Sequence, residues 1–210
     1  MDFLTITYFY YFYNMPRKLY KNRHYNTPGH AHELTFSCYR RKTFFDDFEA
    51  CQLFLEELDR SRDIYSFKLR AYVVMPHHVH LLLWPLHSNY AIGKILSGIK
   101  GIMAKRYRKH LIKNNRALHD TFLLTINKRQ KFVFRQKGGG FDGNLWNAKA
   151  VHDSIGYIEA NPVRSRLVAS PDEWKWSSAH ARAHRKGVVP DTVALPVVLE
   201  NPQAQRIGII

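Results

Sequence analysis

Apolar and polar positions alternate along residues 30–41, and two denser apolar runs follow at residues 65–75 and 78–85. Alternation and enrichment in β-branched and aromatic residues predict a strand for each of the three. Pro76 separates the last two runs, and proline cannot donate a hydrogen bond inside a central strand. The Met-Pro-His-His stretch is therefore predicted to be a turn that pairs the second strand with the third.

Three further segments repeat their apolar residues at helical spacing, namely residues 46–63, 89–115 and 147–168. The third of these is predicted to be closed by Pro162. The remaining segments are a β-rich run, a glycine-rich loop and a short aromatic and basic stretch (121–135, 138–146 and 170–187). Helices between strands, with a hairpin in the middle, predict an α+β fold with a mostly antiparallel central sheet sandwiched by helices.

The 210 residues allow one domain with a hydrophobic core, which we place at residues 15–184. Residues 1–14 are apolar and aromatic and precede a second methionine, Met15, so we interpret them as an over-extended reading frame. An extra strand or a membrane-surface anchor is the alternative. Residues 185–210 are predicted to be a weakly structured tail.

Lysine and arginine outnumber the acids by 32 to 17, which gives a formal net charge of +15. Such an imbalance indicates a polyanionic partner, nucleic acid or an anionic membrane, although a solvated basic surface is the plain alternative. The two cysteines, Cys38 and Cys51, lack metal-ligand spacing and fit a reducing cytoplasm.

The helix predicted over residues 89–115 has an apolar stripe and is otherwise basic. It can pack the stripe on a sheet and present its charge to phosphates, or it can be an ordinary solvated amphipathic helix. The candidate phosphate-binding residues are Lys94, Lys100, Lys105, Arg106, Arg108 and Lys109.

Three histidines, His77, His78 and His80, lie where the third strand begins. Residues i and i+2 of a strand share a face, so His78 and His80 point the same way, while Val79 and Leu81 point toward the core. His77 lies in the turn and is not expected to join them. Two imidazoles on a rigid strand can bind one divalent ion and leave positions open for substrate, although a lone His-x-His is more often ordinary surface or core.

The helix around residues 153–163 places Tyr157 and Asn161 one turn apart, on a different stripe from Val151, Ile155 and Ile158. A phenol and a carboxamide held in this way can meet the same ligand, and the amide oxygen can coordinate a hard cation. Alternatively, Tyr157 packs half-buried and Asn161 only ends the helix before Pro162.

Taken together, these stretches resemble a known family, the single-tyrosine HUH transposases (IS200-like transposases). The motifs VVMPHHVHLLL and YIEANPVRSRLV lie about 75 residues apart, and GGGFDGNLW and DEWKWSSA resemble segments of the REP-associated branch found in bacteria. The resemblance runs from about His30 to Ala183. It implies an HUH endonuclease fold with a ferredoxin-like, RRM-like core.

The resemblance also implies the roles of individual residues. His78, His80 and Asn161 would bind Mg²⁺ or Mn²⁺, and Tyr157 would be the nucleophile. The implied activity is the cleavage and rejoining of single-stranded DNA beside a hairpin formed by a palindromic repeat, through a 5′-phosphotyrosine intermediate. No ATP and no membrane would be needed, and the protein would act as a monomer or a homodimer.

This chain departs from the family pattern in two places. His77 occupies a turn position that is often Asn, and Gly143 occupies a position that is more often Arg. Loss of that arginine removes a possible DNA contact and affects the choice of substrate more than the chemistry. Two other functions stay open: a non-catalytic nucleic-acid-binding protein on the same scaffold, and a nuclease of plasmid replication or conjugation. The latter usually has a third histidine that is not found here.

Overall fold

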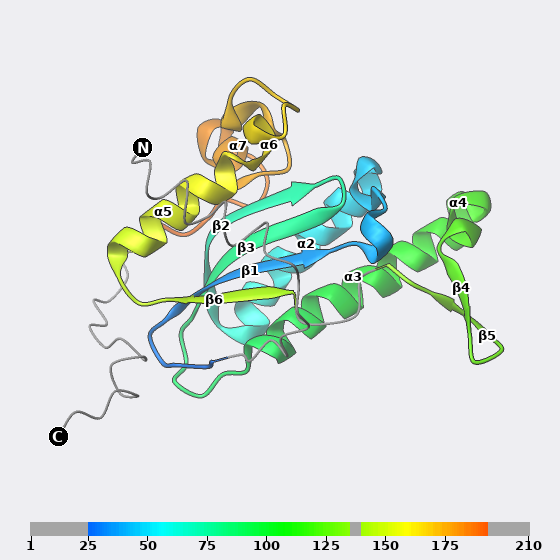
Figure 1. The fold of residues 1–210 in the computed structure, drawn as a ribbon, viewed down its shortest axis with the longest axis horizontal. Coiled ribbons are helices and arrows are strands. Elements are labelled where there is room, and N and C mark those ends of the chain that lie inside the picture. The colour runs from blue at the N-terminus through cyan, green and yellow to red at the C-terminus, as the bar shows by residue number, and fades with distance from the viewer. Residues whose placement is uncertain (1–24, 135–139, 193–210) are drawn as a thin grey trace, which may run out of the picture.

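The computed structural model describes residues 25–134 and 140–192. Its centre is a four-stranded antiparallel sheet in the order β2-β3-β1-β6 (Figure 1). The strands are β1 (Ala31–Ser37), β2 (Phe67–Met75), β3 (His78–Pro85) and β6 (Phe141–Leu145). The predicted α+β class and the predicted hairpin at Pro76 are confirmed.

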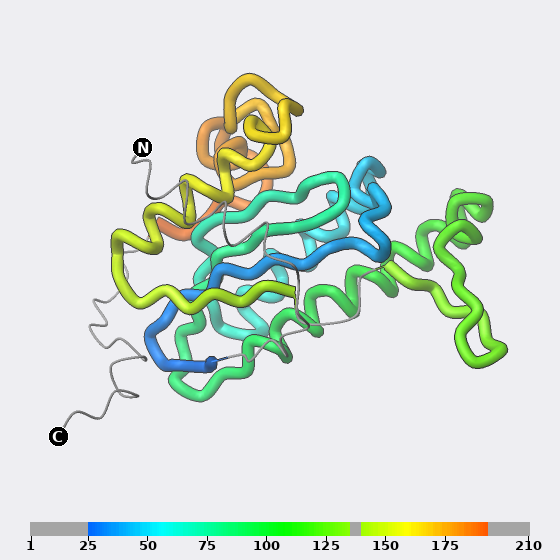
Figure 2. Tube along the Cα trace, viewed as in Figure 1, coloured from blue at the N-terminus to red at the C-terminus, as the bar shows by residue number. Residues whose placement is uncertain are grey.

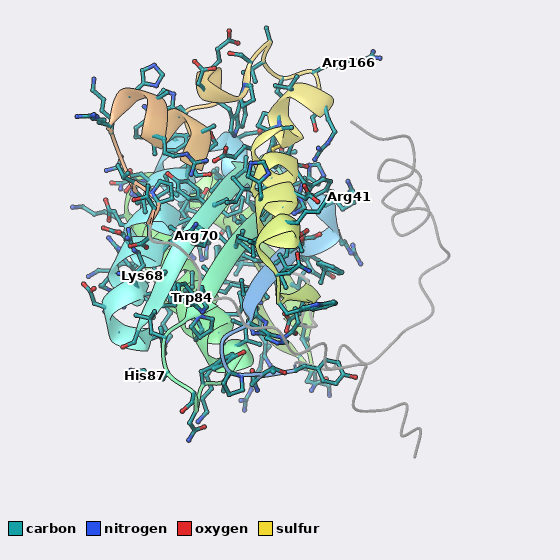
Figure 3. All side chains as sticks on the ribbon, turned by 90° about the vertical axis from the view of Figure 1, so that its left-hand side faces the viewer. Arg41, Lys68, Arg70, Trp84, His87 and Arg166 are labelled. Atoms are coloured by element: carbon teal, nitrogen blue, oxygen red, sulfur yellow. The ribbon has the colours of Figure 1, made fainter. Side chains whose placement is uncertain are left out.

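Helices cover both faces of the sheet, as the side view shows (Figure 3). On one face lie α2 (Phe48–Tyr65) and α3 (Ile92–Asn114), which pack with β1 and β3 in the larger apolar core. On the other face lies α5 (Ala148–Glu159), which packs with β2 and β3 in a smaller apolar cluster. Short elements complete the chain: η1 (Tyr39–Arg41), η2 (Phe44–Asp46), α4 (Arg116–Thr121), α6 (Asn161–Arg164), η3 (Pro171–Glu173) and α7 (Ser178–His184).

The glycine-rich segment, predicted to be a loop, forms strand β6 over Phe141–Leu145. That prediction was wrong because cross-strand partners stabilise the segment: Asp142 receives a hydrogen bond from buried His32 at 2.7 Å. Gly140 has a φ of 77°, and a Cβ there would lie 1.9 Å from the carbonyl oxygen of Thr35. Glycine therefore lets this strand approach β1 closely. Residues 135–139 lie outside the described part.

The β-rich run at 121–135 forms a separate two-stranded sheet, β4 (Leu123–Ile126) and β5 (Arg129–Phe132). Its turn residues Asn127 and Lys128 have φ values of 51° and 60°. A two-residue hairpin turn with both φ values positive matches the twist of its strands.

The helix predicted over 147–168 breaks at Ala160 and resumes as α6. Pro162 lies in the first turn of α6, where a missing N–H is tolerated, but it cannot donate to the carbonyl of Ile158 one turn earlier. The side-chain amide of Asn161 donates to that carbonyl instead, at 3.3 Å. The break thus follows from the proline, and it fixes the side chain of Asn161.

No helix within residues 25–134 and 140–192 is both long and apolar enough to cross a membrane. The interpretations of residues 1–14 and of most of the tail, 193–210, concern residues outside the described part of the chain.

Candidate active site

His78 and His80 lie on the face of β3 that α5 covers, and their rings are 4.8 Å apart between centroids. Val79 and Leu81 face the opposite core with α2 and α3, as the two-residue period predicts. Tyr157 of α5 packs its ring edge-on against His80, with the centroids 5.8 Å apart. Residues far apart in sequence therefore meet between the sheet and α5.

His80 is 1% exposed, and its Nδ1 is hydrogen-bonded to Oγ1 of Thr35 on β1 at 2.8 Å. In the tautomer with the proton on Nδ1, the threonine oxygen accepts and Nε2 keeps its lone pair. Nε2 of His80 and Nδ1 of His78 are buried and have no hydrogen-bond partner among the described residues. Buried polar atoms are normally satisfied, so two unpaired imidazole nitrogens side by side fit a bound cation.

Both histidines are held neutral. Burial lowers the pKa of His78 to about 4, and the nearby charges of His77 and Arg41 add to the effect. Burial also lowers the pKa of His80 well below 6.5, with His78 and Arg164 as further causes. A neutral imidazole is the form that ligates a metal ion.

His77 lies outside this pair, as expected for a turn residue. Its Nε2 accepts a hydrogen bond from Nη2 of Arg41 at 2.7 Å. That contact occupies Nε2 of His77, whose ring centroid lies 4.6 Å from that of His78.

Asn161 is 8% exposed, and its Nδ2 donates to the carbonyl oxygens of Tyr157 and Ile158 at 3.0 and 3.3 Å. In the described structure these bonds anchor the end of α5 and do not reach either histidine. Asn161 is the first residue of α6, and Ala160 is the residue that ends α5. With Nδ2 engaged, the amide oxygen is the atom that remains for a cation.

Sequence reasoning missed two residues, one beside the tyrosine and one on β1 near Ser154 and Arg164. Arg164 stacks its guanidinium 4.1 Å from the centre of the Tyr157 ring and donates to the Tyr157 carbonyl at 2.8 Å. Glu33 on β1 is buried, and burial raises its pKa, while Ser154 and Arg164 oppose that shift. In the sequence, Glu33 could have been found from the alternation of polar residues along β1, and Arg164 from its position seven residues after Tyr157.

Gly143 pairs with Glu33 across β1 and β6, and directly opposed residues of a sheet share a face. The arginine common at this position in the family would therefore project from the active-site face. Here the ring of Phe141 covers the position, since a Cβ on Gly143 would lie 2.9 Å from the ring. The effect of this loss on DNA contacts stays a prediction.

The basic helix is only partly as expected. Lys100 is buried, and its amine lies 5.1 Å from the centre of the Phe36 ring, so its prediction as a phosphate contact was wrong. It lies on the stripe of α3 that faces the sheet. Arg106 is paired with Glu56. The exposed members of the set are Lys94, Lys105, Arg108 and Lys109.

The two tryptophans near α7 take part in packing. Trp174 donates from Nε1 to the carbonyl of Val74 at 2.9 Å, and Trp176 packs edge-on against Phe48. Both side chains are half-buried.

The neutral histidines predict acid sensitivity of the metal-free protein. The unfolded chain takes up protons at the ordinary pKa of 6.5, whereas folded His78 resists protonation down to about 4 and His80 resists it as well. The free energy of unfolding should therefore fall as the pH drops from 6.5 toward 4, by roughly 1–2 kcal/mol at pH 5 through His78, and His80 adds a loss in the same direction. Urea unfolding in EDTA at pH 7 and pH 5 measures this. The variant His80→Gln should show a smaller pH dependence, and an equal one would contradict the assignment.

Comparisons with known proteins concern the family and the fold. The family described as "Transposase IS200 like" matches residues 27–127, which contain both histidines. A solved structure titled as a REP-associated tyrosine transposase bound to a REP hairpin has the same fold, with a TM-score of 0.60 and 17% identity. The alignment covers 87% of this chain and 100% of that one. A search of curated proteins gave no match.

The fold and the family match define a transposase-type protein with an antiparallel sheet between helices. Nearly half of the chain, residues 27–127, matches the IS200-like transposase family.

Proposed function

We propose that this protein is a transposase that cleaves and rejoins single-stranded DNA beside a hairpin, with a divalent metal ion and a covalent tyrosine intermediate. One observation carries the proposal: Tyr157 lies against His80, whose Nε2 is buried and unpaired beside His78. Tyr157 would supply the nucleophile and the two histidines the cation site. The match of residues 27–127 to a family described as IS200-like transposases supports a role in transposition.

The phenol oxygen of Tyr157 would attack the scissile phosphorus and form a tyrosine–phosphate bond, while the bond to the 3′ oxygen breaks. The 3′ oxygen leaves as a hydroxyl, which later reverses the reaction. His78, His80 and the amide oxygen of Asn161 are the residues that would hold Mg²⁺ or Mn²⁺. When bound, the ion would offset the negative charge that builds up on the phosphate. Because the phosphoester energy is conserved in the tyrosine link, no nucleotide is consumed.

A suitable test incubates the protein and Mn²⁺ with a strand that carries a hairpin and a label on either side of it. A covalent adduct should survive denaturation and carry the label from the 5′-phosphate side only. Peptide mapping should place the DNA on Tyr157. If no labelled hairpin strand gives an adduct with either metal, the non-catalytic binding function is favoured instead.

Arg164 is expected to position the nucleophile, because it holds both the ring and the carbonyl of Tyr157. Arg164→Gln should lower the single-turnover cleavage rate by roughly 10- to 100-fold with little change in DNA affinity, since a small misplacement of a reacting group costs this much. Arg164→Lys should restore part of the rate through its charge. Equal losses in rate and in affinity would mean that Arg164 mainly binds DNA.

A further inference from the structure

A basic arm extends from one side of the molecule. We define it as residues 105–132, the last part of α3 together with α4 and the β4–β5 hairpin (Figure 2). It contains nine lysine and arginine residues against one acid, Asp120, so it carries a net +8 of the chain's +15. More than half of the excess charge thus lies in a small protruding segment that the candidate active site does not use.

The arm is rooted in the hydrophobic core. Phe122 and Phe134 lie at its base and pack on Phe44, with ring centroids 4.2 and 5.0 Å from it. All three rings are buried, and Tyr107 of α3 contacts two of them. Since a packed aromatic base restricts motion, the charges are held in a defined place relative to the sheet.

The same base lies beside the candidate active site. The backbone N–H of Tyr39 donates to Phe134 at the base of the arm, and that of Cys38 donates to His77 in the turn before His78. Lys42 donates to the carbonyl of Thr121 at the end of α4. One short segment therefore connects the histidine turn to the root of the arm.

The basic side chains of the β4–β5 hairpin are available to a ligand. Lys128, Arg129 and Lys131 are exposed, and none has an ion-pair partner among the described residues. Arg129 and Lys131 are two residues apart on β5, so they share one face of the ribbon. On α3, the side chains of Lys105, Arg108 and Lys109 line one surface hollow.

The aromatic residues of the arm are not available for base stacking. Tyr107 and Phe122 are buried, and Phe132 is half-buried against His119. Proteins that bind single strands combine basic grooves with exposed aromatic platforms, whereas a duplex keeps its bases stacked and is gripped through its phosphates. A two-stranded ribbon also fits the major groove of B-DNA.

We propose that the basic arm binds duplex DNA through its phosphates, and that its ligand is the paired stem of the hairpin beside the cleavage site. This inference rests on the proposed function, because the segment after β1 connects the base of the arm to the turn before His78. A membrane surface is less favoured, since the only large apolar side chain exposed among the described residues of the arm is Ile112.

The test replaces the two basic residues that share one face of β5, with the double variant Arg129→Gln/Lys131→Gln in the full chain. Binding is measured in EDTA, at several salt concentrations, to a closed DNA hairpin and to an unpaired strand of equal length. We expect the variant to bind the DNA hairpin roughly tenfold more weakly. The slope of log affinity against log salt concentration should become shallower by about 2, since each phosphate contact contributes about 0.9 to that slope. Binding of the unpaired strand should not change.

The matched control is Arg185→Gln/Lys186→Gln, which removes the same charge from exposed residues after α7. An equal loss with the control would overturn the proposal, because the effect would then be one of total charge. An equal loss on both DNA probes would also overturn it, as would arm-dependent binding to phosphatidylserine vesicles with unchanged hairpin binding. Binding in EDTA does not involve Tyr157, so a missing covalent adduct would reject the proposed function without changing this result.

Discussion

Tyr157→Phe is expected to abolish the covalent protein–DNA adduct while leaving hairpin binding within about twofold of the wild type. The ring that packs against His80 and under Arg164 is retained, so only the attacking oxygen is lost. Removal of an enzymatic nucleophile commonly lowers the rate by 10⁴-fold or more, roughly to the limit of detection. A denaturing gel with labelled DNA measures the adduct, and a binding titration in EDTA measures affinity.

Tyr39→Phe is the control for this experiment, because Tyr39 follows β1 and its backbone lies beside the histidine turn. It should form the adduct at the wild-type rate. Should the Tyr157→Phe protein still become attached to DNA, another residue is the nucleophile and the proposed site is wrong. Loss of both adduct and binding would instead indicate damage to the fold, which urea unfolding detects.

Local rules predicted the part of the site that lies within one element. The two-residue period of a strand is enough to place His78 and His80 together, opposite Val79 and Leu81. The helical period likewise separates Tyr157 from the buried Val151 and Ile158. Such rules use only the neighbours along the chain, so their conclusions hold wherever the element packs.

Contacts between elements could not be predicted in the same way. That Thr35 bonds to His80 depends on the antiparallel register of β1 and β3, and the alternation in either strand does not specify that register. The proximity of Tyr157 to His80 depends on which face of the sheet α5 covers. Resemblance to a family supplied that pairing in the sequence analysis, and the structure supplies its geometry.

Two predictions failed because of contacts between elements. The glycine-rich segment contains few β-forming residues, yet pairing with β1 and the bond from His32 to Asp142 make it a strand. Lys100 was assigned to the exposed face of its helix because of its charge. Its position on the helix places it toward the sheet, where the aromatic ring of Phe36 lies beside its amine. In both cases tertiary partners outweigh the preference of the residue itself.

The second large expected effect concerns the metal ligands. His80→Gln should reduce Mn²⁺ affinity by more than 100-fold and abolish detectable cleavage, because it removes the imidazole nitrogen that is buried and unpaired. Mn²⁺ binding is measured by electron paramagnetic resonance of the free ion, independently of DNA cleavage. Urea unfolding in EDTA checks that the variant is folded.

Thr35 and His77 turn this into a graded comparison. Thr35→Val keeps the shape of the side chain but removes the oxygen that orients His80, and loss of such a supporting hydrogen bond typically weakens metal binding by about 10- to 100-fold. His77→Gln should leave Mn²⁺ affinity unchanged, because Nε2 of His77 already accepts a hydrogen bond from Arg41. This geometry requires that Mn²⁺ affinity is highest in His77→Gln, lower in Thr35→Val and lowest in His80→Gln. Equal losses in all three variants would mean that the turn as a whole stabilises the fold and that His80 is no specific ligand.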